Sequence, residues 1–93
     1  MIKANEYFEG NVKSLGFATV EGDSSVGVME AGEYTFGTGK PEIMHVIEGE
    51  MSILLKGETE WKTYKAGEHF NVEGNSSFDV KTSGQTAYLC QYR

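Results

Sequence analysis

Glycine is the residue that most constrains this chain. Twelve glycines are spread through 93 residues, and no stretch without glycine is longer than nine residues. A glycine inside a helix costs about 0.5–1 kcal/mol relative to alanine, and the average α-helix has about 11–12 residues. The spacing therefore favours short strands joined by tight turns over long helices.

The segments between the glycines have the period of β-strands. Apolar residues recur at every second position, at Leu15 and Phe17, Val26 and Val28, Tyr34 and Phe36, Met51, Ile53 and Leu55, Phe70 and Val72, Phe78 and Val80, and Tyr88, Cys90 and Tyr92. Residues 43–47 are apolar at both alternating sets, which predicts a strand covered on both faces. Turn residues separate these runs about every 8–12 residues, as in an antiparallel sandwich or barrel. The chain is therefore predicted to be all-β, with residues 1–93 forming a single domain.

Charge and cysteine content narrow the classes of function. Fourteen acidic and eight basic residues give a net charge of −6, which argues against nucleic acid or an anionic membrane as partner. A small anionic ligand needs only a few hydrogen-bond donors close to it, so the net charge does not exclude one.

Cysteine content and apolar runs indicate the location of the protein. Cys90 is the only cysteine, and residues 1–9 lack the apolar core of a signal peptide. No apolar run approaches the roughly 20 residues that are needed to span a membrane. We expect a cytoplasmic protein.

Two segments resemble the cupin motifs. Glu42-Ile-Met-His-Val-Ile-Glu-Gly-Glu50 is similar to the end of the first motif, and Ala66-Gly-Glu-His-Phe-Asn-Val72 to the start of the second. This resemblance implies a small antiparallel β-barrel, or jelly-roll-like sandwich. The His-x-His pair of metal-binding cupins falls here on Thr35 and Gly37, so we expect no metal and no cofactor.

Further segments resemble one cupin family from end to end. They are Asn5-Glu-Tyr-Phe8, Val12-Lys-Ser-Leu-Gly-Phe17, Ser25-Val-Gly-Val-Met29, Gly32-Glu-Tyr-Thr-Phe36, Phe70-Asn-Val72 and Tyr88-Leu-Cys90 with Tyr92. They are similar to the pyrimidine/purine nucleoside phosphorylases. The resemblance implies a cytosolic homodimer that cleaves purine and pyrimidine nucleosides, with phosphate as co-substrate, to free base and ribose 1-phosphate. Such an enzyme is a glycosyltransferase.

The loop of residues 35–41 and the carboxylate after it are the first candidates for a site. Thr35, Thr38 and Lys40 offer hydroxyls and an ammonium to phosphate, although an ordinary strand connection would have the same composition. Glu42 occupies the position at which cupins point a carboxylate into the barrel. It could bind ribose hydroxyls or stabilise positive charge at C1′, or it could be a rim carboxylate in water.

Aromatic and ionisable residues supply the remaining candidates. Tyr34 and Phe36 could hold a base between them, although alternating aromatics are usually core. His45, in an apolar strand, is a candidate proton donor to the departing base or a structural histidine. Other candidates have simpler explanations. The aromatic residues are more readily explained as core, His69 as a surface residue and Cys90 as an inert thiol; the aromatic residues are Tyr7, Phe8, Trp61, Phe70 and Tyr92. Lys13 and Arg93 are the remaining cations that could bind phosphate.

Two other functions are compatible with the same residues. The first is a cupin that binds a small metabolite without turning it over. The second is a structural module, in which aromatic and methionine side chains would fill the barrel and leave no cavity near Thr35 and Glu42.

Overall fold

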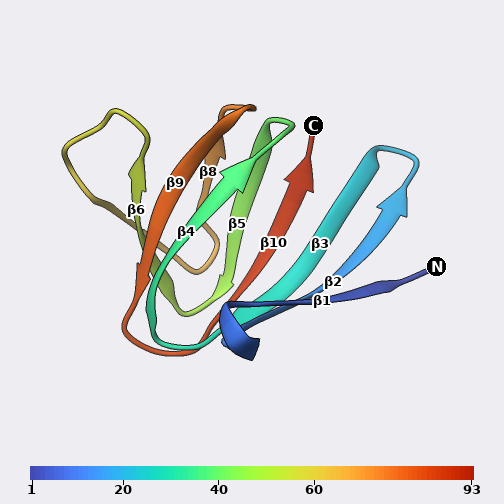
Figure 1. Ribbon diagram of the computed structural model, residues 1–93, viewed down its shortest axis with the longest axis horizontal. Coiled ribbons are helices and arrows are strands. Elements are labelled where there is room, and N and C mark those ends of the chain that lie inside the picture. Colours follow the sequence, from blue (N-terminus) through green and yellow to red (C-terminus); the bar gives the residue numbers. More distant parts are fainter.

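The computed structural model describes all 93 residues, as two antiparallel β-sheets packed face to face (Figure 1). The elements are β1 (Lys3–Tyr7), η1 (Phe8–Gly10, a single 3-10 turn), β2 (Val12–Thr19), β3 (Gly22–Met29), β4 (Gly32–Thr38), β5 (Glu42–Glu48), β6 (Glu50–Leu55), β7 (Lys62–Lys65), β8 (His69–Val72), β9 (Ser76–Thr82) and β10 (Thr86–Tyr92). One sheet has the order β1-β2-β3-β10-β5-β8, and the other has the order β4-β9-β6-β7. The all-β prediction is confirmed. No helix is long and apolar enough to cross a membrane.

The hydrophobic core lies between the two sheets. Thirteen buried residues form one cluster: Val12, Met29, Tyr34, Met44, Val46, Met51, Ile53, Phe70, Val72, Phe78, Val80, Tyr88 and Cys90. Alternate side chains of a strand point to opposite faces, so β5, β6, β8, β9 and β10 each contribute two residues, two positions apart, to this cluster. Removing their apolar surface from water is the main stabilising contribution.

In the middle of β2 and β3 the large apolar side chains face outward, whereas Val12 and Met29, at one end of each strand, point into the core. Leu15, Phe17, Val26 and Val28 are between 37% and 52% exposed. The opposite face, toward the other sheet, carries small residues instead: Ser14, Gly16, Ser25 and Gly27. This part of the inner face is therefore small and polar, and the space above it is not filled by core side chains.

The outer side of β5 is only partly covered. Ile43 and His45 are half-buried on this side, and Ile47 is 50% exposed. The prediction that both faces of residues 43–47 are covered is therefore wrong for the outer face of a single chain.

The first strand and its turn bring the edges of the two sheets together. β1 pairs only with β2, and the chain then turns through positive φ angles at Phe8 and Glu9, 53° and 59°. The Phe8 ring reaches the edge strand of the other sheet, with its centroid 5.0 Å from that of Tyr34 and 5.4 Å from that of Phe36. Phe8 thus joins β1 to β4 at one side of the space between the sheets.

Candidate functional site

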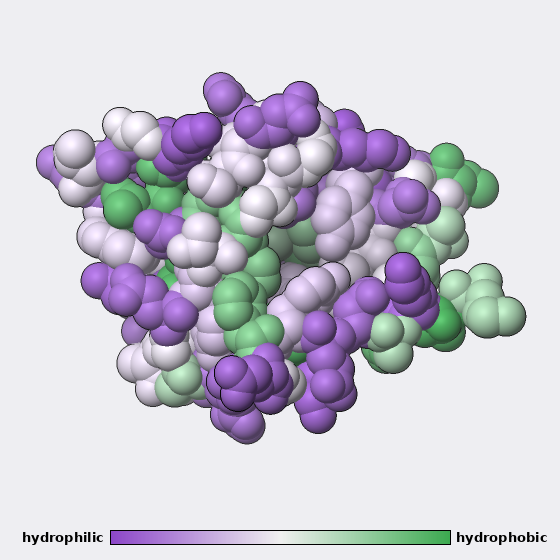
Figure 2. Space-filling model, viewed as in Figure 1, coloured by the Kyte–Doolittle hydropathy of each residue, from purple (hydrophilic) through white to green (hydrophobic).

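A cavity of about 950 Å³ lies between the inner face of the six-stranded sheet and β4. It is open to solvent on one side, and the recess near the middle of the face in Figure 2 shows the hollow. Thr35 and Glu42 are both among the residues that line it. A barrel filled by its own side chains, as the structural-module alternative requires, is therefore not what this sequence forms.

The two sides of the cavity differ in chemistry. The four-stranded sheet contributes an aromatic wall, in which the rings of Phe36 and Phe78 are stacked with centroids 5.7 Å apart. The six-stranded sheet contributes a polar floor, made by Ser14, Ser24, Ser25, Glu42, Tyr88, Cys90 and Tyr92. A few polar groups facing an apolar surface are typical of a site that binds a small molecule.

Glu42 is the buried acidic group of this floor. Its side chain lines the cavity, the residue is only 9% exposed, and the thiol of Cys90 donates a hydrogen bond to Glu42 Oε1 at 3.4 Å. Burial raises the pKa of the Glu42 carboxyl above its ordinary value, and the hydrogen bond from Cys90 opposes part of this rise. Burial, followed by the neighbouring Glu42 charge, raises the pKa of the Cys90 thiol. Cys90 therefore stays protonated as a donor and does not serve as a nucleophile.

Two tyrosines complete the polar floor. The Tyr92 hydroxyl lies 2.8 Å from Ser25 Oγ, and burial raises the pKa of Tyr92 to about 12. Burial also raises the pKa of Tyr88, whose ring lies against Gly27, where a Cβ atom would come within 2.5 Å of Tyr88 Oη. Both phenols are therefore neutral at physiological pH and able to exchange hydrogen bonds with ligand hydroxyls.

Four of the predicted site residues line the cavity: Thr35, Phe36, Lys40 and Glu42. The Thr35 hydroxyl, however, points away from it and donates to Asp79 Oδ1 at 2.7 Å on the exposed face of β4 and β9. Phe36, Lys40 and Glu42 are the side chains that the structure brings together around one space.

Tyr34 and Thr38 do not line the cavity. The Tyr34 hydroxyl donates to the Glu30 carbonyl at 2.7 Å, and its ring is part of the core. The Thr38 hydroxyl donates to the Glu73 carbonyl at 2.6 Å and accepts from the Ser76 amide at 3.0 Å. Thr38 therefore holds the turn before β9, and its hydroxyl is already occupied.

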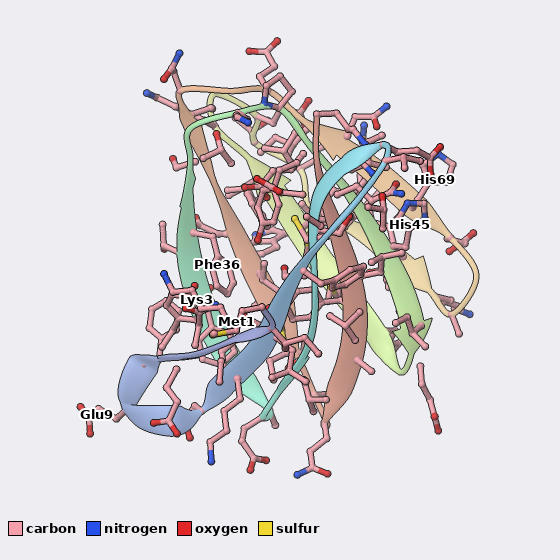
Figure 3. The ribbon with its side chains drawn as sticks, turned by 90° about the vertical axis from the view of Figure 1, so that its right-hand side faces the viewer. Met1, Lys3, Glu9, Phe36, His45 and His69 are labelled. Atoms are coloured by element: carbon pink, nitrogen blue, oxygen red, sulfur yellow. The ribbon has the colours of Figure 1, made fainter.

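His45 lies on the other side of the sheet from Glu42. The two residues are three positions apart on β5, and an odd separation places side chains on opposite faces of a strand. His45 Nε2 is 2.8 Å from Gln91 Oε1, and its ring lies beside that of His69, away from Phe36 (Figure 3). The structure therefore separates the two residues predicted to be catalytic. No three His, Cys, Asp or Glu side chains converge on one point.

Lys3 and Asn5 are among the cavity residues that the sequence pattern did not single out as site candidates. They alternate with Ala4 and Glu6 on β1, a strand with no apolar period, so hydrophobic patterning could not identify it. Lys13, by contrast, lies on the outer face and pairs with Glu6 at 3.8 Å.

Comparison with known proteins identifies the family of the chain. Residues 2–92 match the family model described as pyrimidine/purine nucleoside phosphorylase. A protein of that name from Shewanella pealeana is 58% identical over 92 residues, 99% of each chain, and one from Pseudomonas savastanoi pv. phaseolicola is 55% identical over the full length of both.

Two solved structures have the same fold as this chain. A Vibrio parahaemolyticus protein of unknown function superposes with a TM-score of 0.97 at 55% identity, covering 100% of this chain and 99% of that one. An RmlC-like cupin from Shewanella frigidimarina superposes with a TM-score of 0.73 at 16% identity, covering 99% and 83%, and supports the cupin fold alone. The chain therefore belongs to the pyrimidine/purine nucleoside phosphorylase family.

Proposed function

We propose that this protein is a nucleoside phosphorylase that cleaves purine and pyrimidine nucleosides with phosphate, giving free base and ribose 1-phosphate. The observation that carries the proposal is the buried Glu42 carboxyl at the polar floor of a ligand-sized cavity. The match of the whole chain to the family supports the choice of reaction.

The two sides of the cavity suit the two parts of a nucleoside. The flat base lies against the rings of Phe36 and Phe78, and the ribose hydroxyls face Tyr92 and Glu42 on the floor. This orientation holds C1′ in place for attack, which accounts for a large share of the rate gain in reactions of two bound partners. A wall of this kind contacts purine and pyrimidine rings alike, which favours broad specificity.

Phosphorolysis makes one bond and breaks another at C1′. A phosphate oxygen attacks C1′ while the bond from C1′ to the base nitrogen breaks, and the departing base takes up a proton. Positive charge develops on the ribose in the transition state. Glu42 binds the ribose hydroxyls, and in its ionised form it also stabilises that charge, an effect that the burial of this carboxyl strengthens. No residue is assigned as proton donor, because His45 does not reach the cavity.

A cytosolic homodimer is part of the same proposal. The exposed apolar side chains of β2 and β3, with Ile47 of β5, form an apolar outer face on the six-stranded sheet. A chain of 93 residues alone buries only about 60–65% of its unfolded surface, so covering this face with a second copy would add stability. The free thiol of Cys90 is compatible with a reducing compartment.

The test is to incubate uridine, inosine and adenosine with the purified protein, with and without phosphate, and to measure free base and ribose 1-phosphate. We expect base from all three only when phosphate is present. Glu42→Gln should lower turnover about a hundredfold or more, whereas Glu33→Gln, an exposed residue outside the cavity, should not. Binding of nucleosides without any release of base would instead favour a cupin that only binds a metabolite.

A further inference from the structure

A hollow lies over Gly16 at one end of the polar floor. Gly16 pairs with Lys3 on one side and Ser25 on the other, and Asn5 pairs with Ser14 one step along the strands. A Cβ atom built on Gly16 would meet nothing closer than 3.7 Å, and Asn5 Nδ2 would be 4.0 Å away. All five residues line the cavity, so the hollow over Gly16 is a part of the cavity that Lys3 and Asn5 border closely.

The side chains nearest this hollow offer hydrogen-bond donors, and the one carboxylate close by is that of Asp23, which lies one inward pair farther along the strands, opposite Ala18. Lys3 and Asn5 share the cavity side of β1, while the acidic Glu6 points outward and pairs with Lys13. That pair is the only salt bridge in the molecule, so the Lys3 ammonium has no acidic partner. Lys3 and Phe36 both line the cavity, Lys3 from β1 and Phe36 from β4. An ammonium, an amide and hydroxyls are the set that suits an oxyanion.

The hollow is also well placed relative to Glu42. Across the floor the register runs from Gly16 to Ser25 to Cys90, and Cys90 is the residue that contacts Glu42. At about 4.8 Å per strand, about 10 Å of floor separates Gly16 from Cys90, which is room for a ribose. Lys40, by contrast, is only two residues from Glu42.

We propose that inorganic phosphate binds in the hollow over Gly16, held by the Lys3 ammonium, the Asn5 amide and the hydroxyls of Ser14 and Ser25. The inference rests on the proposed function for the identity of the anion, and it assigns the phosphate to the first three strands instead of the loop of residues 35–41. Phosphate bound there is kept away from the Glu42 carboxyl, and its attack on C1′ comes from the β1 side of the ribose.

The test titrates inorganic phosphate alone into the protein in a chloride buffer and measures binding by calorimetry. Lys3→Gln should weaken phosphate binding about tenfold or more, since it removes a charge-assisted hydrogen bond. Gly16→Ala should also weaken it, because the added methyl group enters the hollow, while contacts no closer than 3.7 Å leave the fold intact, as circular dichroism would show. Lys13→Gln, on the outer face, is the matched control and should stay within about twofold of the wild-type protein.

Uridine cleavage measured against phosphate concentration separates this inference from the proposed function. A raised KM for phosphate in Lys3→Gln, with kcat little changed, would support the subsite. Cleavage with an unchanged phosphate KM in Lys3→Gln, or a loss of phosphate binding in Lys40→Gln alone, would overturn the subsite and leave the phosphorylase intact. Phosphate binding that depends on Lys3, without any cleavage of nucleosides, would keep the anion subsite and overturn the proposed reaction.

Discussion

Burial of Glu42 makes the stability of this protein depend on pH in a defined direction. Its carboxyl has a raised pKa in the folded state, whereas in the unfolded chain it titrates near the ordinary value of 4.5. Below that pH the group is neutral in both states. As the pH rises through the raised pKa, the folded state must ionise a buried group, so the free energy of unfolding falls.

Glu42→Gln should therefore raise the Tm at pH 7, by about a few degrees, and this gain should shrink as the pH falls toward 4.5. Thermal melts across pH measure it, with Glu33→Gln as the exposed control. A Glu42→Gln protein that is less stable than the wild-type protein at pH 7 would mean that Glu42 is held by favourable contacts stronger than its desolvation cost.

Gly27 is required because the Tyr88 ring lies against it. A Cβ atom there would approach Tyr88 Oη to 2.5 Å, so the Tyr88 ring, which is only 6% exposed, would have to leave its present packing. Gly27→Ala should destabilise the protein by about 1–3 kcal/mol, as overpacking of a core does. Urea denaturation measures this, with Gly37→Ala as control because a Cβ there meets no atom within 4 Å. Equal effects of the two changes would contradict this packing.

At the scale of elements, the period of two predicted strands but did not predict which face of a strand is inside. On β2 and β3 the apolar set that includes Leu15 and Val26 faces solvent, and the small polar set faces the cavity. An alternating pattern shows only that two faces differ. Where β2 and β3 border the cavity, the small polar set points inward, and only the packing of the whole sheet reveals this.

The sequence predicted only part of the candidate site, because an alternating pattern does not show which face of a strand points inward. Phe36 and Glu42 lie on the inward sets of β4 and β5, and Lys40 lies on the turn between these strands. His45 belongs to the outward set of β5, and the hydroxyl of Thr38 is used by a turn distant in sequence. Proximity in sequence to Glu42 therefore did not place these two side chains at the cavity.

The turn that follows β1 should control how firmly that strand is held. Phe8 is the aromatic contact between this turn and β4, and β1 has hydrogen-bonded pairing on one side only. Phe8→Ala should speed amide hydrogen exchange in Lys3–Tyr7 by about tenfold, because strand opening then costs less. Val20→Ala, in the exposed turn between β2 and β3, is the control. Unchanged exchange in β1 would show that pairing with β2 alone holds the strand.

At the scale of the whole molecule, the apolar outer face predicts self-association. Val26 is 40% exposed in the centre of this face, opposite Leu15 on β2 and Leu89 on β10. Val26→Asp should convert a dimer into a monomer, since a buried unpaired carboxylate at an interface is costly. Light scattering after size-exclusion chromatography measures the mass. Val20→Asp, at an exposed turn, should leave the dimer intact, and a wild-type monomer would contradict the prediction.

The proposed phosphorolysis differs from hydrolysis and from simple binding in one chemical requirement. An oxygen atom of the phosphate must become bonded to C1′ of the ribose. The most direct measurement is mass spectrometry of the sugar product after uridine is cleaved in the presence of phosphate labelled with ¹⁸O at every oxygen. We predict ribose 1-phosphate that keeps the full label, in amounts equal to the uracil released. Free ribose carrying an oxygen from water, or no release of uracil, would contradict the account.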